Sequence, residues 1–142
     1  MRQAGGQAVE VTDVELRDAA GRTTAVFRTG GSLQVVTTLK ARRQLSRGVL
    51  ALELRSQEGV CVYRTRHEFE PAADGSAHVA FEVADLALLG GDYDLSLGAA
   101  EAGEPGLERT VRFSVARDED AQGLVDLKGA WRTLVEAEQI GP

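Results

Sequence analysis

The sequence predicts an all-β domain, a β-sandwich or jelly roll built from eight or nine short antiparallel strands. Apolar and polar residues alternate along most of the chain, as in residues 93–97, which read Tyr-Asp-Leu-Ser-Leu. Alternation at a period of two is typical of a strand with one buried face, because successive side chains point to opposite faces of the sheet. The 16 glycines among 142 residues supply turns between such segments. Short alternating segments separated by turns indicate a sandwich.

The first three strands are expected in the N-terminal third of the chain. Residues 9–16 alternate except at residues 12–13, where the break predicts a β-bulge. Gly21 follows in a turn, since glycine can adopt a positive φ. Residues 24–27 form a short strand closed by a Thr-Gly-Gly turn, and residues 33–39 place Leu, Val, Thr and Leu at every second position.

Residues 50–55 and 60–67 are expected to form a hairpin, because three leucines alternate with Ala, Glu and Arg in the first segment. Gly59 fits the left-handed position of a three-residue connection. With this connection residue 54 faces residue 62, and the two valines of the second strand join the leucines on the buried face. A four-residue connection would exchange the two faces of the second strand, and the sequence leaves both registers open.

The C-terminal half repeats the pattern. Residues 79–83, 93–97 and 111–115 each place three large apolar residues at every second position, and each is expected to form a strand. Residues 123–127, which read Gly-Leu-Val-Asp-Leu, are expected to add a last short strand. Residues 130–139 have the composition of a short C-terminal helix.

A single domain is expected, with residues 1–7 as a flexible lead-in, residues 8–132 as the sandwich and residues 133–142 as a tail. A chain of this length can bury an apolar core without disulfides. Cys61 is the sole cysteine, so no internal disulfide can form and nothing supports an oxidising compartment. No segment approaches the ~20 apolar residues of a membrane span, and the N-terminus lacks the apolar region of a signal peptide. The expected location is cytoplasmic.

Charge and composition argue against several function classes. The net charge of −6 disfavours a nucleic acid partner, whose phosphates are neutralised mainly by basic residues. One basic cluster, interpreted as a solvated loop, consists of Lys40, Arg42, Arg43 and Arg47. No phosphate-binding glycine-rich loop, no Gly-x-Ser-x-Gly motif and no zinc-site spacing is present, and carboxylate pairs such as Glu68 with Glu70 have no assigned acid and base roles. We therefore expect neither an enzyme nor a bound metal or cofactor.

The outer face of the expected hairpin offers hydrogen-bond donors, acceptors and an aromatic ring on adjacent strands. The candidate carbohydrate-binding residues, two of them from a strand expected to lie beside the hairpin, are Glu53, Arg55, Tyr63, Thr65, His67, Asp94 and Ser96. Planar polar side chains can bind paired hydroxyls, while a ring packs against the apolar face of a sugar. The residue types alone favour an ordinary solvated face with cross-strand pairs such as Glu53 opposite Tyr63.

The order of several short motifs resembles a known family. These motifs are Val-Thr-Asp-Val-Glu-Leu at 11–16 with Asp18 and Gly21 after it, Val-Phe-Arg-Thr-Gly-Gly-Ser-Leu at 26–33, Glu-Gly-Val at 58–60, residues 86–97, Phe-Ser-Val at 113–115, Gly-Leu-Val-Asp-Leu at 123–127, and Trp131. Over residues 8–132 the sequence resembles the C-terminal polysaccharide-binding domain of Wzt-type ABC transporter ATPases, which export O-antigen. One departure is Arg-Thr-Arg-His at residues 64–67, where family members often have a Gly-Thr-Asn-Thr-like run, so that only Thr65 is comparable.

The resemblance implies an immunoglobulin-like or jelly-roll sandwich that binds the modified end of a lipid-linked, O-antigen-like polysaccharide for export, without catalysis. It implies as partners the ATPase and membrane subunits of an ABC transporter, at the cytoplasmic face of the plasma membrane and without insertion into it. The ATPase would lie in another domain or a separate chain.

The resemblance also implies a homodimer in which the C-terminal strand is exchanged between protomers. The residues expected to serve this exchange are Gly123, Leu124, Val125, Leu127 and Trp131. Trp131 would anchor the exchanged strand on a partner or, alternatively, cap the core of its own domain.

Two other functions compete with this one. A protein-interaction or dimerisation sandwich without a glycan ligand would dock a partner through an edge strand or the C-terminal segment. A glycoside hydrolase fragment would need two carboxylates about 5–10 Å apart in a deep cleft.

Overall fold

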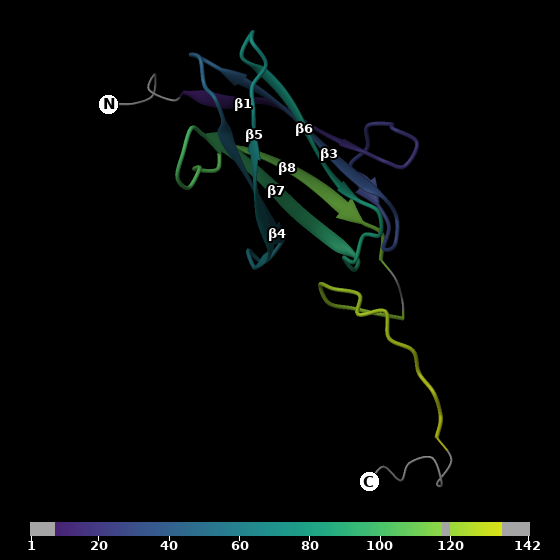
Figure 1. Ribbon diagram of the computed structural model, residues 1–142. Coiled ribbons are helices and arrows are strands. Elements are labelled where there is room, and N and C mark those ends of the chain that lie inside the picture. Colours follow the sequence, from purple (N-terminus) through teal and green to yellow (C-terminus); the bar gives the residue numbers. More distant parts are fainter. Residues whose placement is uncertain (1–7, 118–119, 135–142) are drawn as a thin grey trace.

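The computed structural model describes residues 8–117 and 120–134, and it consists of two β-sheets packed face to face (Figure 1). The strands are β1 (Val9–Arg17), β2 (Val26–Phe27), β3 (Leu33–Ala41), β4 (Gly48–Ser56), β5 (Cys61–Phe69), β6 (Ser76–Val83), β7 (Gly91–Ala100) and β8 (Arg109–Val115). The described residues contain these eight strands and no helix, which confirms the predicted all-β sandwich.

The two sheets differ in size. One has three strands in the order β1-β3-β6, and the other has five in the order β2-β8-β7-β4-β5. Neighbouring strands are antiparallel except β2 and β8, which pair in parallel over two residues. The edge strands β5 and β6 lie on the same side of the sandwich, where side chains from the two contact one another. The sandwich is therefore open between β5 and β6.

Three aromatic rings form the centre of the core. Phe113 stacks on Tyr93 with ring centroids 5.6 Å apart and meets Phe27 edge-on at 5.7 Å. Tyr93 is buried, and its hydroxyl donates a hydrogen bond to the carbonyl oxygen of Leu89 at 2.6 Å. Burial raises the pKa of Tyr93, since an ionised phenol would lose its hydration there. The rings tie β2, β7 and β8 to the interior of the sandwich.

Several local features of the sequence can be compared with the structure. The bulge predicted near residues 12–13 is confirmed, because the register of β1 against β3 shifts between Val11 and Asp13. The strand expected over residues 123–127 is reduced to one β-bridge between Leu88 and Val125, since only the backbone around Val125 reaches the sandwich. Residues 130–134 are not helical, and the remainder of the expected helix lies outside the described residues.

The loop between β7 and β8 folds back against β7. A Cβ atom built on Gly98 would lie 1.8 Å from the carbonyl oxygen of Gly106, so the two backbones are in direct contact. The Glu108 carboxylate then accepts hydrogen bonds from the backbone N–H groups of Val11, at 2.9 Å, and Ala99, at 3.2 Å. These contacts fasten the loop to both sheets.

Candidate functional site

The turn between β4 and β5 is closed around three residues, 57–59, which is one of the two connections that the sequence left open. The backbone N–H of Ser56 donates to the carbonyl oxygen of Val60 at 2.9 Å, and Gly59 has a φ of +87°. Such a φ strains any residue with a side chain, which explains the glycine. Next to the turn, Arg55 pairs with Cys61, the register that a three-residue connection requires.

Beyond this point the register shifts by one residue. Leu54 pairs with Tyr63 rather than with Val62, because β5 carries an extra residue, a β-bulge, next to the Arg55 pair. The predicted pairing of residues 54 and 62 is therefore wrong. Val62 still packs against the core, as predicted, whereas Val60 is exposed. A one-residue shift moves every following side chain to the other face of the sheet.

The shift divides the predicted binding residues between two faces. Tyr63, Thr65 and His67 pair with the inward-facing leucines of β4. Arg64 pairs with Glu53, so the arginine, not the tyrosine, shares the outer face with this carboxylate. The prediction that all these residues lie on one outer face is wrong, and the bulge is the reason.

The outer face of the five-stranded sheet carries charges that pair with one another. Strand β7 lies beside β4, as expected, with Ser96 opposite Glu53 and Asp94 opposite Arg55. The Glu53 side chain is only 5% exposed, and it accepts hydrogen bonds from Arg55 Nε and, at 2.8 Å, from Arg64 Nη2. Glu53 is therefore held between two guanidinium groups.

The same pairing continues toward β8. Asp94 accepts a hydrogen bond from Arg112 Nε at 3.0 Å, and the hydroxyls of Ser96 and Thr110 lie 2.8 Å apart. Because these polar groups satisfy one another, the outer face has little unused hydrogen-bonding capacity for a ligand.

The hydrogen bond from Arg64, followed by that from Arg55, holds the pKa of Glu53 below its usual value of 4.5, although burial opposes this shift. A carboxyl group whose folded pKa is lowered stabilises the fold above its unfolded pKa and loses that contribution as pH falls through the folded value. We expect Glu53→Gln to destabilise the domain by about 1–2 kcal/mol at neutral pH, a loss limited by the solvent exposure of both arginines. Urea unfolding should show the difference from the parent shrinking as pH falls below 4.5.

The control for this prediction is Glu68→Gln. Glu68 also pairs with an arginine, Arg47, but its side chain is 68% exposed. An exposed pair contributes little to stability, so this variant should unfold close to the parent at every pH. A constant difference between Glu53→Gln and the parent across the acid range would contradict the assigned role of Glu53.

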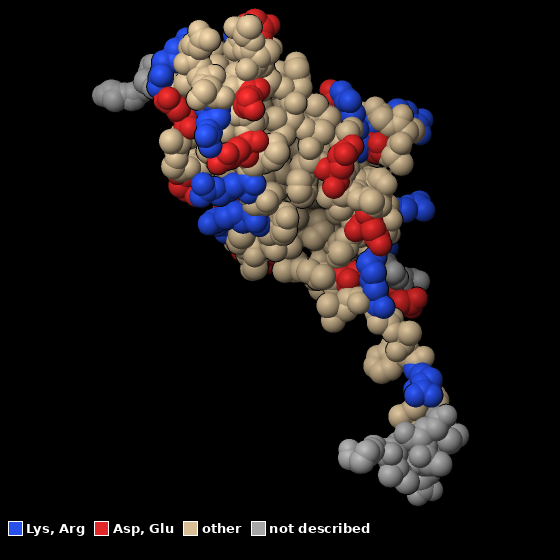
Figure 2. Space-filling model, viewed as in Figure 1, with Lys and Arg blue, Asp and Glu red and all other residues tan. Residues whose placement is uncertain are grey.

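Three hollows that share lining residues follow the open side of the sandwich between β5 and β6, and together they are called the groove. The upper section is polar, has a volume of about 1080 Å³ and lies at the end of the groove lined by His67 and Ser76. The middle section has a volume of about 230 Å³ and shares the lining residues His67 and Val79 with the upper section. The lower section has a volume of about 440 Å³, lies at the end lined by Tyr63, and shares Leu52 and Phe81 with the middle section. Figure 2 shows a hollow in the uncharged surface, with basic side chains on one side of it and acidic side chains on the other.

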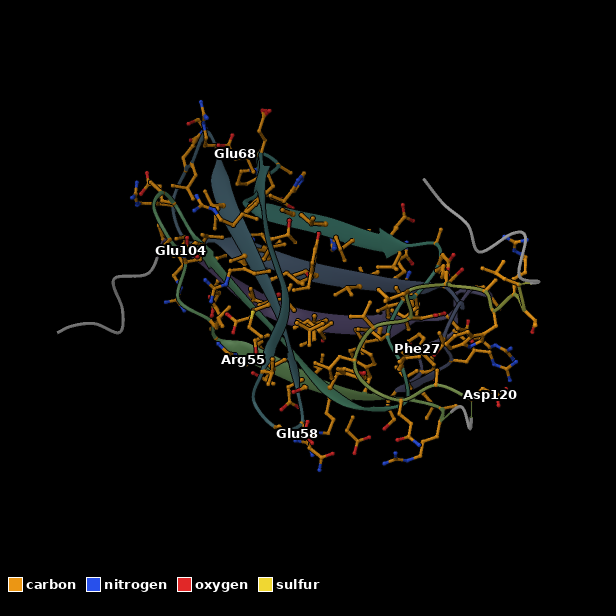
Figure 3. The ribbon with its side chains drawn as sticks, turned by 90° about the horizontal axis from the view of Figure 1, so that it is seen from below. Phe27, Arg55, Glu58, Glu68, Glu104 and Asp120 are labelled. Carbon is orange, nitrogen blue, oxygen red and sulfur yellow. The ribbon has the colours of Figure 1, made fainter. Side chains whose placement is uncertain are left out.

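Aromatic and polar side chains meet in this groove. Tyr63 is 48% exposed, and the centroid of its ring lies 6.1 Å from that of Phe81 on β6. Thr65 and His67 follow at every second position of β5, along the strand that runs between Glu58 and Glu68 in Figure 3. The Tyr63 ring thus stands at the edge of the groove, accessible from solvent.

A buried hydroxyl lies in the middle section. Thr37 on β3 lines this section and is 1% exposed. None of the residues that the structure describes forms a hydrogen bond with its hydroxyl group. Buried hydroxyls normally have a partner, so this one is available to a group that enters the groove.

Residues 120–134 form an arm that extends away from the sandwich (Figure 1). Its first part is attached by two backbone hydrogen bonds, from Leu89 N to Leu124 O at 3.0 Å and from Asp126 N to Ala87 O at 2.7 Å. Further along, Leu127 is 88% exposed and Trp131 is fully exposed. The alternative in which Trp131 caps the core of its own domain is therefore wrong.

The basic cluster pairs with carboxylates on neighbouring segments. Its arginines form three ion pairs, Arg42 with Glu10, Arg43 with Glu101 and Arg47 with Glu68. Within residues 8–117 and 120–134, no three His, Cys, Asp or Glu side chains are arranged to hold a metal ion. This part of the chain also has no helix of the length and apolarity needed to cross a membrane.

Comparison with known proteins decides the family. A family model described as the Wzt C-terminal domain matches residues 1–127. The chain belongs to the Wzt C-terminal domain family. A crystal structure of the C-terminal domain of Wzt superposes with a TM-score of 0.77 at 17% identity, covering 90% of this chain and 85% of that one. The predicted resemblance is confirmed, and the family supports a carbohydrate-binding role in O-antigen export.

Other solved structures share only the fold with this Wzt C-terminal domain. The alkylpurine DNA glycosylase AlkC of Pseudomonas fluorescens has a TM-score of 0.56 at 13% identity, covering 79% of this chain and 31% of that one. A β-glucosidase of Listeria innocua has a TM-score of 0.51 at 15% identity, covering 73% and 16%. In both, the likeness involves a small part of a larger protein. No curated protein matches the sequence.

Proposed function

We propose that this Wzt C-terminal domain binds the end of a lipid-linked, O-antigen-like polysaccharide and presents it to an ABC transporter for export. The observation that carries the proposal is the family match over residues 1–127 together with the structural likeness to the Wzt domain. The family is one of non-catalytic binding domains, and we propose that this member has no enzymatic activity.

We propose the groove between β5 and β6, rather than the outer sheet face, as the binding site. It is concave, and it combines a half-exposed aromatic ring, Tyr63, with polar side chains at Thr65 and His67. A sugar can stack its apolar face on the ring while its hydroxyls bond to the neighbouring polar groups. On the outer face, by contrast, the charges are already paired.

The remaining predicted contacts define a second candidate surface. Glu53, Arg55, Asp94 and Ser96 lie together on the outer face of the five-stranded sheet. A polysaccharide that bound there would have to displace ion pairs such as that between Asp94 and Arg112. The cost of breaking these pairs is the reason for preferring the groove.

We also propose that the domain acts as a homodimer, through the arm. Gly123, Leu124, Val125, Leu127 and Trp131 would then contact the partner protomer. The exposure of Trp131 and Leu127 supports this, because large apolar side chains exposed together commonly mark an interaction surface. Two binding sites held close together would strengthen binding by raising the effective concentration of sites near the polysaccharide end. The ATPase and membrane subunits of the transporter would be the other partners, at the cytoplasmic face of the plasma membrane.

The test is an NMR titration of the ¹⁵N-labelled domain with polysaccharide purified from the source strain. We expect amide shifts to change for residues of β5 and β6 that line the groove, around Tyr63, Thr65 and Phe81. Shifts confined to β4, β7 and β8 on the outer face would move the site to that surface. No change at saturating polysaccharide would contradict the proposed function and favour the rival, a protein-interaction module that acts through the arm.

A further inference from the structure

A separate hollow, called the end hollow below, lies at the end of the sandwich beside the β4–β5 turn. Its volume of about 690 Å³ falls within the range of about 300–1,000 Å³ that is typical of small-molecule sites. Three segments form its walls: residues 56–58 and 60 at the turn, residues 90–93 at the start of β7, and residues 117 and 121–124 at the base of the arm. None of these residues lines the groove, so the end hollow is a distinct site.

The backbone holds charged side chains on two sides of the end hollow. A Cβ atom built on Gly90 would lie 2.5 Å from the Cα atom of Arg117, so the glycine allows the chain at Arg117 to lie against the start of β7. On the other side, Glu58 lies at the β4–β5 turn (Figure 3). Burial, and after it the charge of Glu58, raises the pKa of Tyr93, so the Glu58 carboxylate lies within electrostatic reach of this phenol.

Charged groups in the end hollow have unused hydrogen-bonding capacity, unlike those on the outer sheet face. Within residues 8–117 and 120–134, neither Glu58 nor Arg117 forms an ion pair or a side-chain hydrogen bond. Asp92 accepts one hydrogen bond, from the Ser114 hydroxyl at 2.6 Å, and a carboxylate can accept several more. A ligand could therefore bind these groups without first breaking an ion pair.

A buried hydroxyl adds a donor to this site. Ser56 lines the end hollow and is 2% exposed. Its oxygen accepts a hydrogen bond from the backbone N–H of Val60 at 3.2 Å, but no described residue accepts a hydrogen bond from its hydroxyl group. Buried polar groups normally have partners, so this hydroxyl is available to an acceptor atom that enters the hollow.

The chemistry of the lining favours an uncharged, polyhydroxylated ligand. Glu58 and Asp92 accept hydrogen bonds, Arg117 and Ser56 donate them, and two glutamine amides can do both. A small anion would face two carboxylates, and a small cation would face the guanidinium group. Sugar hydroxyls donate and accept without carrying charge, and Val60, which is 52% exposed, offers an apolar surface to the C–H groups of a sugar ring.

The end hollow lies next to the groove, with the attached part of the arm between them. Leu124 lines the end hollow, and the next residue, Val125, lines the lower section of the groove. A polymer that places its end in the groove could therefore reach the end hollow with a neighbouring part of the same chain. Contacts at two linked sites strengthen binding, because the second contact is intramolecular.

We propose that the end hollow is a second sugar-binding site, which binds an uncharged interior sugar unit of the polysaccharide whose end lies in the groove. This inference rests on the proposed function, which places the polysaccharide on this domain. It adds a separate site for the body of the polymer, with Glu58, Asp92, Arg117 and Ser56 as the contacts to sugar hydroxyls.

The experiment is an NMR titration of the ¹⁵N-labelled full chain with two probes. One probe is polysaccharide purified from the source strain, and the other is a set of interior oligosaccharides, cut from that polysaccharide by partial hydrolysis after its terminal unit has been removed. The interior oligosaccharides should shift the amide signals of Gln57, Gly91 and Gln122 in the end hollow. The whole polysaccharide should shift these signals together with those around Tyr63 in the groove.

Two variants test the assigned contacts. Arg117→Gln and Glu58→Gln should each weaken binding of the interior oligosaccharides about tenfold, because each removes a hydrogen bond to a charged group. Both side chains are exposed and lie on different walls, so either variant can serve if the other does not fold. The control is Arg109→Gln, an exposed arginine at the opposite end of β8 and outside the hollow, which should bind like the parent.

The outcomes separate this inference from the proposed function. If the interior oligosaccharides leave the end-hollow amides unchanged while the source polysaccharide shifts the groove amides, the inference is wrong and the proposed function stands. If neither probe changes any amide signal, the proposed function fails and the inference fails with it. If the end-hollow amides shift instead when the protein concentration is raised without glycan, a second copy of this chain occupies the hollow, and the inference is overturned.

Discussion

Replacing Tyr63 with alanine is expected to weaken binding of the source polysaccharide by about 30-fold, a loss of ~2 kcal/mol typical of an aromatic side chain central to an interface. The residue is 48% exposed at the edge of the groove, so removal of its ring takes away a stacking surface for a sugar. Stability should change little, because about half of the residue is already exposed to solvent. Isothermal titration calorimetry measures the affinity, and thermal unfolding checks the fold.

The matched control is Arg112→Ala on the outer face, a side chain 61% exposed that pairs with Asp94. It should leave polysaccharide binding unchanged if the groove is the site. Equal binding by Tyr63→Ala and the parent, with loss of binding in Arg112→Ala, would reverse the assignment in favour of the outer face.

The fold could be predicted because it depends on a local and repeated signal. Apolar residues at every second position identify β3, β6, β7 and β8, and each of these strands packs that face against the core in the structure. The bulge in β1 was predictable for the same reason, since the alternation itself breaks between Val11 and Val14. Both the strands and the bulge could be predicted from the local sequence, without knowing which strands are neighbours in the sheet.

The candidate site depends on a feature without such a signal. Residues 61–67 read Cys-Val-Tyr-Arg-Thr-Arg-His, in which neither set of alternate positions is clearly apolar. β5 is an edge strand, and most of its side chains are exposed on both faces. The sequence pattern therefore places little constraint on its register, and the bulge next to Arg55 decides which residues face the groove.

Contacts between distant segments were also beyond the reach of the sequence. Thr37 reads as an inward residue of β3, but its position in the groove depends on β6 and β5 both being edge strands on one side. Likewise the contact between Gly98 and Gly106 depends on how the β7–β8 loop folds back. Glycine patterns alone do not distinguish a close backbone approach from an ordinary turn.

Gly98→Ala is expected to destabilise the domain by about 3 kcal/mol, which lowers the unfolding temperature by roughly 10 °C. The added Cβ would lie 1.8 Å from the Gly106 carbonyl oxygen and 2.7 Å from its carbonyl carbon, and both are backbone atoms that cannot rotate away. The loop must then move off β7. Its displacement would also pull the Glu108 carboxylate from the backbone N–H groups of Val11 and Ala99.

Gly106→Ala is the control, because it adds a methyl group to the other side of the same contact. A Cβ there meets no atom within 4 Å, so the variant should be as stable as the parent or slightly more stable through reduced freedom of the unfolded chain.

Polysaccharide binding by Gly98→Ala gives a second readout. The β7–β8 loop that this substitution displaces lies over the outer face, near Glu53 and Arg64, and not in the groove. A folded fraction of Gly98→Ala should therefore bind with parental affinity, whereas weakened binding at full folding would indicate that the ligand contacts the outer face after all.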